Sequence, residues 1–451
     1  MKNAIRWKTA AIAFAAICLG NVGYAATPQW VSVWKADPTG STGAIAPGTQ
    51  TLREIISPRR AGDTVRLRLT NREGTLPVSL SEVWIGTQQS GAQLVAGSNR
   101  QLSFGGQRGV YLAPGQDIVS DPLPYRVLPF TKLAISMQTS GVLGMPALSS
   151  SHSVSRETNY YSVALPVFGE GAGKESGAGF MPFTLTAGVT FQASWHYISG
   201  LDVLTTDPKP RVVVAFGDSI TDGLTVNPAT DNTFVENIAN LGADERYPDF
   251  LQRRFAALPK YKSFNVVNAG IAGNRLTAGP FAPFFGPRGL SRMETDVIQV
   301  PGVTDVVAHF GINDIAFDQS AQLSSSRAIG QTLIAGYQEM ITRLQARGIR
   351  VVLGTIMPAV GAGFGPASPT VNGGVAHGTE ITESIRQEVN AWIRGPGKSL
   401  SDGVVDFDAC MRDPNSTSRL NPAFNSGDNL HPTGVGYSVM AGCFDLAVLF
   451  P

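Results

Sequence analysis

The sequence predicts a chain of two parts, an all-β region followed by a three-layer α/β/α domain. Two observations carry this prediction. Between residues 30 and about 206, short segments are separated by Gly, Pro, Asn and Asp clusters, and no stretch longer than about ten residues has a helical period. After residue 210, runs rich in β-branched residues alternate with helical stretches, as in a parallel sheet with helices on both faces. We therefore expect a β-sandwich or jelly roll, then a five-stranded parallel sheet in flavodoxin-like order.

The first 25 residues have the pattern of a signal peptide rather than of a folded segment. Lys2, Arg6 and Lys8 precede an apolar run over residues 9–19, and a small-x-small pattern ends at Ala25. We predict cleavage after Ala25 and export, so the mature protein is expected to be secreted or periplasmic.

The charge of the remaining chain excludes several partner classes. Without the three cations of the leader, 32 Lys and Arg face 34 Asp and Glu, a formal net charge of −2. No basic block indicates a nucleic acid or a charged membrane surface as partner. No later run of about 18 apolar residues predicts a membrane anchor. The sequence does not determine the oligomeric state, and a monomer is favoured.

The predicted β-rich domain covers residues 26–206. Residues 64–70 (TVRLRLT) alternate apolar and polar side chains, as a half-buried strand does. Similar segments lie at residues 79–85, 110–112, 116–119, 132–137 and 189–197. The Pro-rich stretch 205–210 (TTDPKP) marks the boundary of this domain.

The predicted α/β domain covers residues 207–451. Its strands are expected at residues 212–215, 265–268, 305–310, 350–354 and 404–407. Its clearest helices are expected at residues 247–258, 326–347, 381–393 and 435–450. Gly348 follows the second of these helices, where a C-terminal cap is common.

The stretch 211–223 (RVVVAFGDSITDG) is where we expect the chemistry. An apolar strand ends at a polar turn that opens onto a helix, and Ser219 lies on this turn. Open α/β sheets bind their ligands at this edge, and the Ser219 N–H would lie at the positive end of a helix. Ser219 is therefore a candidate nucleophile.

A serine nucleophile needs a general base, usually a histidine that a carboxylate orients. Of the five histidines, His431 has Asp428 three residues upstream, a spacing that lets one turn present both side chains. Alone, such a pair is more often a solvated loop pair than a catalytic one. The attack also creates an oxyanion, which needs preorganised donors. Two further polar turns follow predicted strands and offer the Gly273 N–H and the Asn313 side-chain amide.

Taken together, these pieces resemble the SGNH hydrolases of the GDSL esterase/lipase family. Four motifs occur in the family's order: Gly-Asp-Ser at 217–219, the Gly273 turn, Gly-x-Asn-Asp at 311–314 and Asp-x-x-His at 428–431. The resemblance implies that Ser219 is the nucleophile, His431 the base and Asp428 its orienting residue. It also implies an oxyanion hole made by the Ser219 N–H, the Gly273 N–H and the Asn313 amide. The β-rich first part resembles, more loosely, secreted bacterial members with an N-terminal β-domain.

Two long Gly- and Pro-rich stretches, 277–289 and 359–378, interrupt the α/β domain. Phe281, Phe284 and Phe285 in the first are candidates for an apolar wall or lid, and irregular surface loops are an equal alternative. His377 in the second is a candidate substrate contact. Cys410 and Cys443 remain after the leader, and a disulfide between them is favoured over two buried thiols in an exported protein.

The other acids and histidines have structural interpretations. Asp218 and Asp314 are expected to bond local backbone N–H groups, and Asp222 is expected near the start of the first helix. Asp406 and Asp408 end the fifth strand without a nearby histidine, and His309 is expected in the core. His152 and His196 lie in the β-region, where no Cys or His has metal-ligand spacing, so we expect no metal site.

The resemblance implies a serine esterase that needs neither metal nor cofactor. Its substrate is expected to be a small-molecule or polysaccharide ester: we favour short-acyl carboxylic esters, with polysaccharide O-acetyl esters or lipids as alternatives. A secreted glycan-binding protein without activity is the alternative of a different class. Because the Ser, Gly, Asn, Asp and His positions are all present, we favour the enzyme.

Overall fold

The computed structural model of the chain describes residues 27–40, 49–143, 150–163, 171–182, 194–226, 236–237, 239–280, 283–320, 325–363, 375 and 377–451. The predicted signal peptide, residues 1–25, lies outside these ranges, and so do Phe281 and most of the stretch 359–378. No helix within these ranges is long and apolar enough to cross a membrane.

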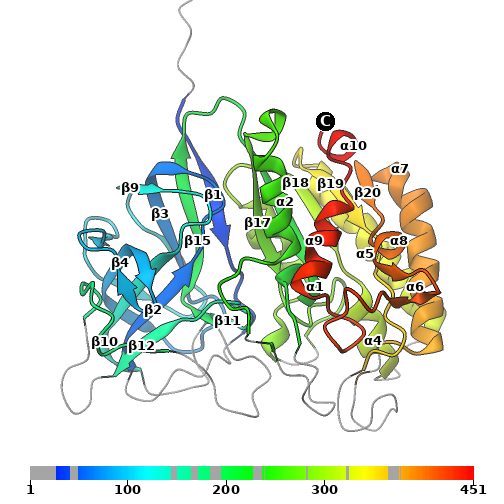
Figure 1. The fold of residues 1–451 in the computed structure, drawn as a ribbon, viewed down its shortest axis with the longest axis horizontal. Coiled ribbons are helices and arrows are strands. Elements are labelled where there is room, and N and C mark those ends of the chain that lie inside the picture. The colour runs from blue at the N-terminus through cyan, green and yellow to red at the C-terminus, as the bar shows by residue number, and fades with distance from the viewer. Residues whose placement is uncertain are drawn as a thin grey trace, which may run out of the picture.

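The first part of the chain consists of antiparallel sheets (Figure 1). One sheet contains β1 (Gln29–Lys35), β15 (Ile198–Thr205), β3 (Gly62–Thr70) and β8 (Asp117–Val119) in this order, with β9 (Leu123–Val127) also paired to β3. The larger sheet contains β13 (Met181–Pro182), β12 (Tyr160–Val163), β2 (Thr49–Ile56), β10 (Leu133–Leu143), β4 (Val78–Ser90) and β5 (Gln93–Leu94), with β6 (Arg100–Gln101) and β7 (Val110–Leu112) paired to β4. A third pair joins β11 (Ser151–His152) to β14 (Trp195–His196). Apolar side chains of the two large sheets meet in one buried cluster, and the predicted all-β fold of this part is confirmed.

The predicted β segments 64–70, 79–85 and 110–112 fall within β3, β4 and β7, and two others overlap β8 and β10. Most of the segment 189–197 lies outside the described residues. The pattern missed β2, since Arg53 and Glu54 interrupt its apolar residues. Both side chains are fully buried and paired: Arg53 donates to the Ala92 carbonyl at 2.5 Å, and Glu54 accepts from the His196 N–H at 2.6 Å.

The second part contains a five-stranded parallel sheet in the order β17 (Phe264–Gly270), β16 (Arg211–Gly217), β18 (Val303–His309), β19 (Arg350–Gly354) and β20 (Gly403–Val405). This is the flavodoxin-like order that the sequence predicted. The interior strand β16 is buried from Val212 onward, as an apolar run in a parallel sheet must be.

Helices flank this sheet (Figure 1). They are α1 (Ser219–Asp222), α2 (Tyr247–Ala256), α3 (Gly289–Met293), α4 (Ile312–Ser320), α5 (Ser326–Gln345), α6 (Glu380–Trp392), α7 (Lys398–Leu400), α8 (Phe407–Met411), α9 (Gly434–Gly442) and α10 (Leu446–Leu449). Single turns η1 (Pro259–Tyr261), η2 (Pro283–Phe285), η3 (Glu294–Ile298) and η4 (Ile393–Gly397) and the hairpin β21 (Arg412–Asp413) and β22 (Ser416–Leu420) complete the part described.

Three of the four predicted helices are confirmed as α2, α5 and α6, but the prediction of one helix over residues 435–450 is wrong. The chain instead forms α9 and α10, with a break after Cys443. The Asp445 carboxylate accepts from the N–H groups of Ala447 and Val448, and so starts a new helix.

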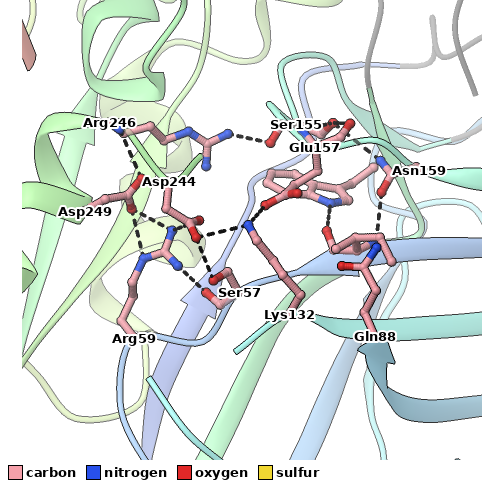
Figure 2. A network of polar contacts seen from close by, with 12 residues as sticks. Ser57, Arg59, Gln88, Lys132, Ser155, Glu157, Asn159, Asp244, Arg246 and Asp249 are labelled. Atoms are coloured by element: carbon pink, nitrogen blue, oxygen red, sulfur yellow. Dashed lines mark hydrogen bonds and ion pairs between the residues drawn. The ribbon is translucent and has the colours of Figure 1, made fainter. Parts of the chain in front are cut away.

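The two parts of the chain meet in an extensive polar and apolar contact. Asn265 of β17 donates to the Ser32 carbonyl of β1 at 2.5 Å. Figure 2 shows a second region, where Arg59 forms ion pairs with Asp249 (2.6 Å) and Asp244 (3.3 Å). Since buried apolar residues of both parts belong to one cluster, the β-region and the parallel sheet pack as one body. The division at residues 205–210 stays a prediction.

Candidate active site

Ser219 lies at the carboxyl edge of the parallel sheet, where β16 ends and α1 begins. Asp218 caps α1, because its Oδ1 accepts from the Ile220 N–H at 3.0 Å. Ser219 is the first helical residue and is 4% exposed. The turn therefore places the serine hydroxyl at the N-terminus of a helix, where it has little contact with solvent.

The turn around His431 brings a histidine and a carboxylate to this serine. The distance from His431 Nε2 to Ser219 Oγ is 2.8 Å, and the distance from His431 Nδ1 to Asp428 Oδ2 is 2.5 Å. Asp428 Oδ1 accepts from the N–H groups of Leu430 (3.0 Å) and His431 (2.8 Å), so the turn fixes the carboxylate. With Nδ1–H donating to Asp428, Nε2 is left with a lone pair that can accept the Ser219 proton.

The groups around Asp428 favour its ionised form. Burial opposes its ionisation, but the nearby His431 and the N–H donors outweigh burial and lower the pKa of Asp428. An ionised carboxylate is the form that stabilises a positively charged imidazole.

The two other predicted turns lie beside each other. Asn313 in α4 donates from Nδ2 to the Asn274 carbonyl at 3.1 Å, so it reaches the residue after Gly273. Gly273 has a φ of 73°, and a Cβ there would lie 2.2 Å from the Phe285 ring. Only glycine fits this turn without strain.

His377 contacts Asn313 rather than standing alone in its loop. Its Nε2 lies 3.1 Å from Asn313 Oδ1, and both side chains are buried. An N–H at Nε2 that donates to this oxygen turns the amide so that Nδ2 faces the Gly273–Asn274 turn. Burial lowers the pKa of His377 to about 3, and the charge of His431 adds to the shift, which keeps the ring neutral.

Two side chains that the sequence analysis did not assign to the site hold these turns in place. Arg292 of α3 donates to the carbonyls of Gly217 (3.0 Å) and Ala269 (2.9 Å) and to Asn274 Oδ1 (3.0 Å). It therefore joins the ends of β16 and β17 to the Gly273 turn. No short-range motif links Arg292 to these turns, because the three groups to which it donates there lie 18 to 75 residues away.

Asp314 is the second of these side chains. We expected it to bond its local backbone, but it accepts from the N–H groups of Leu276 (2.8 Å) and Thr277 (2.9 Å), 38 and 37 residues away. Burial raises the pKa of Asp314, although these donors oppose the shift. Asp314 thus anchors the chain that follows the Gly273 turn.

Asp218 does bond its local backbone, as expected, and it is fully buried. Burial raises the pKa of Asp218 to about 7, although the Ile220 N–H and His431 oppose the shift. Perturbed acids and histidines gathered at one edge of a sheet are typical of an active site.

Asp222 lies in the first turn of α1, near the helix start as predicted, because α1 is only four residues long. Its carboxylate also contacts His152 and accepts from the N–H of Ala272, two long-range contacts that the sequence analysis did not include. His309 is buried against Phe407, as expected of a core residue, and burial lowers the pKa of His309 to about 4. Asp406 and Asp408 pair with Arg394, in agreement with a structural role.

Of the three predicted aromatic residues, Phe284 and Phe285 lie in the described part of the chain. Their rings contact each other at 4.6 Å between centroids, and Phe285 also packs on Phe317 at 5.6 Å. Phe317 in turn lies edge-on to His377 at 5.8 Å. A row of contacting aromatic rings therefore runs from the Gly273 turn to His377.

Cys410 and Cys443 form a disulfide that links α8 to the end of α9. Among the residues that the structure describes, no group of three or more His, Cys, Asp or Glu side chains has the arrangement of a metal site.

Comparison with known proteins identifies the family. Residues 215–439 match the family model of the GDSL-like lipase/acylhydrolase family. The chain belongs to this family through its α/β domain, which places it among the hydrolases of acyl esters. A search of curated proteins found no match.

Several solved structures are similar to the chain. A GDSL-like lipase from Bacteroides thetaiotaomicron is 22% identical and has a TM-score of 0.35, over 53% of this chain and 88% of that one. A carbohydrate acetylesterase from Sinorhizobium meliloti is 14% identical with a TM-score of 0.38, over 53% and 100%. A family two carbohydrate esterase from Clostridium thermocellum is 13% identical with a TM-score of 0.36, over 92% and 96%. With TM-scores below 0.5, these likenesses support no statement about the substrate.

Proposed function

We propose that the protein is a secreted serine esterase that hydrolyses short-acyl carboxylic esters through an acyl-enzyme. The observation that carries this proposal is the hydrogen-bonded series from Ser219 Oγ through His431 to Asp428, with distances of 2.8 Å and 2.5 Å. A buried serine, a histidine with its lone pair toward the hydroxyl and an ionised orienting carboxylate are what nucleophilic acyl transfer requires.

In the first half of the reaction, Ser219 Oγ attacks the ester carbonyl carbon while its proton moves to His431 Nε2. The carbonyl oxygen becomes an oxyanion, which accepts from the Ser219 and Gly273 N–H groups and from Asn313 Nδ2. The C–O bond to the alcohol then breaks, and the His431 proton goes to the departing oxygen. The acyl group remains on Ser219.

In the second half, a water molecule replaces the alcohol. His431 Nε2 accepts a proton from this water as its oxygen attacks the acyl carbon, and the same donors hold the second oxyanion. The bond to Ser219 Oγ breaks, the proton returns to Ser219, and the carboxylic acid leaves. Asp428 stabilises the positive imidazole in both halves.

The row of rings formed by the partly exposed Phe284 and Phe285 on the buried Phe317 supports an apolar acyl or aryl group next to the reacting carbon. Phe285 lies directly against Gly273, one of the proposed oxyanion donors. Apolar contact at this point stabilises carbon substituents of the ester more than sugar hydroxyls.

A series of p-nitrophenyl esters from acetate to palmitate, with acetylated xylan in parallel, tests the proposal. We expect the highest kcat/KM on the shortest esters for the wild type and no turnover above background for Ser219→Ala. Release of acetate from xylan would instead make the protein a polysaccharide deacetylase, and a maximum at palmitate would make it a lipase. Binding of polysaccharide without any Ser219-dependent turnover would contradict the enzyme proposal.

The proposal of secretion rests on the N-terminal pattern of residues 1–25. N-terminal sequencing of the exported protein is expected to begin at Ala26. A mature protein that retains Lys2 and Arg6 would contradict it.

A further inference from the structure

His152 of β11 reaches from the β-region to the helix that carries Ser219. Its Nε2 lies 3.0 Å from Asp222 Oδ1, and its Nδ1 lies 2.6 Å from the Asp37 carbonyl oxygen. His152 is 4% exposed and Asp222 1%. This ion pair is therefore buried between the two parts of the chain.

The two partners of His152 favour a doubly protonated ring. A carbonyl oxygen and an ionised carboxylate both accept hydrogen bonds, and a ring that donates from both nitrogens satisfies both contacts. Burial works against this charge, but Asp222 outweighs burial and raises the pKa of His152, while Arg246 opposes the shift. The contact is thus charge-assisted and directional.

Asp222 connects this histidine to two of the proposed oxyanion donors. Its Oδ2 accepts from the Ala272 N–H at 3.1 Å, and Ala272 directly precedes Gly273. Asp222 also shares the four-residue helix α1 with Ser219. One carboxylate therefore joins the backbone segments that carry the Ser219 and Gly273 N–H groups.

The chain next to His152 packs on the same turn. Val154 forms a small buried apolar cluster with Leu224 and Ala272. Arg246 donates to the carbonyls of Val154 (3.0 Å) and Ser155 (2.7 Å), and Figure 2 shows its guanidinium directed at Ser155. The segment 151–155 is therefore held against the α/β domain by three contacts: His152 with Asp222, Val154 with Ala272 and Leu224, and the Val154 and Ser155 carbonyls with Arg246.

We propose that His152 is a positioning residue, supplied by the β-region, that sets the spacing of the oxyanion donors Ser219 and Gly273 through Asp222. This proposal rests on the esterase function proposed above. It makes the β-region a structural part of the active site rather than an independent binding module. The oxyanion donors must be placed to within a fraction of an ångström, so loss of the contact weakens transition-state binding more than substrate binding.

The kinetic test compares His152→Phe and His152→Gln with Arg59→Gln as the matched control. Arg59 also forms a buried ion pair between the two parts, but its partners Asp249 and Asp244 lie in and just before α2 rather than in α1. We expect kcat on a short p-nitrophenyl ester to fall by about 10- to 100-fold in His152→Phe, with KM changed by less than about 3-fold. His152→Gln keeps one donor for Asp222 and should recover part of the loss. Arg59→Gln should lower Tm but leave kcat within about 2-fold.

A double-mutant cycle separates this role from general destabilisation. If His152 acts through Asp222, the losses in kcat of His152→Phe and Asp222→Asn are expected to be strongly non-additive. Additive losses, or equal kcat in His152→Phe and Arg59→Gln, would overturn the proposal.

A readout that does not depend on turnover is hydrogen–deuterium exchange of the peptide 270–276. We expect faster exchange in His152→Phe than in the wild type, since Asp222, the acceptor of the Ala272 N–H, is no longer held in place by His152. No change is expected in Arg59→Gln. Unchanged exchange in His152→Phe would overturn the positioning role. A wild type without esterase activity but with this exchange pattern would refute the function and leave the positioning contact standing.

Discussion

The two edges of the same parallel sheet use their polar residues in opposite ways. At the amino edge, the fully buried Asp305 pairs with Arg211 at 2.5 Å and with Arg350 at 3.3 Å. The three residues stand near the starts of β18, β16 and β19. Charges here neutralise one another across neighbouring strands, which stabilises the sheet.

At the carboxyl edge, the polar groups are buried with their ionisation shifted. Burial raises the pKa of Asp218 to about 7 and lowers the pKa of His377 to about 3. Gly273 and Gly311 have φ values of 73° and 117°, which other residues rarely adopt. The comparison indicates that stability was optimised at one edge and reactivity at the other, as expected where strained and desolvated groups cluster.

The largest expected effect is on activity at the carboxyl edge. Ser219→Ala removes the proposed nucleophile and should lower kcat by about 10⁴-fold or more, with little change in Tm. Ser263→Ala is the matched control, because Ser263 directly precedes β17 at the amino edge, and it should keep kcat within about 2-fold. Steady-state kinetics and thermal melts check both. Equal activity of Ser219→Ala and wild type would show that the carboxyl edge is not the site of reaction.

The next effect concerns the oxyanion. Asn313→Ala removes one donor and should lower kcat by about 10²- to 10³-fold with KM nearly unchanged. The control is Asn390→Ala, which removes another fully buried amide, bonded at 2.8 Å to the N–H and carbonyl of Ile356. This variant should lose stability but little kcat. A rise in KM without a fall in kcat in Asn313→Ala would assign Asn313 to substrate binding instead.

At the amino edge the effect should be on stability alone. Asp305→Asn leaves Arg211 and Arg350 without their shared charge and should lower the free energy of unfolding by about 2 kcal/mol. This is less than the roughly 3–5 kcal/mol of a fully buried pair, since both arginines keep some solvent contact. Denaturant unfolding and kcat/KM measure the two effects. A large loss of kcat at unchanged stability in Asp305→Asn would contradict a purely structural role for the amino edge.

The effect that is smallest at neutral pH, and that grows as the pH falls, is a pH dependence of stability that comes from His377. A free histidine binds its proton near pH 6.5, whereas burial keeps His377 neutral down to about pH 3 in the folded state. As pH falls from about 6.5 towards 3, the unfolded chain gains a proton that the folded chain does not, so wild-type stability decreases. The free energy of unfolding of His377→Gln should therefore fall less steeply over this range. Parallel curves for the two proteins would show that His377 is not held neutral.

Much of the fold and of the candidate site could be predicted because the signals are local. Ser219 follows an apolar strand directly, and Asp428 lies three residues from His431. Alternation of strands and helices predicted the order β17–β16–β18–β19–β20, since right-handed crossovers leave few other arrangements. Short spacing and periodicity suffice for such features.

The contacts that hold the site together could not be predicted, because their partners are distant in sequence. His152 is 70 residues from Asp222, and Arg292 is 75 residues from Gly217. Nothing near either side chain indicates its partner. Asp222 illustrates the same limit: its place in the first turn of α1 could be predicted from the sequence, but its ion pair with His152 could not.

The central claim, that Ser219 is the nucleophile of an acyl-enzyme, is tested most directly by intact-mass spectrometry after treatment with a p-nitrophenyl alkylphosphonate. Such a phosphonate leaves a stable adduct on an activated serine, in the geometry of the tetrahedral intermediate. We predict one adduct per wild-type chain, located by peptide mapping at Ser219. Ser219→Ala should form no adduct, and His431→Ala should form it much more slowly than the wild type. An adduct at another residue, or ester turnover by a wild type that forms no adduct, would contradict it.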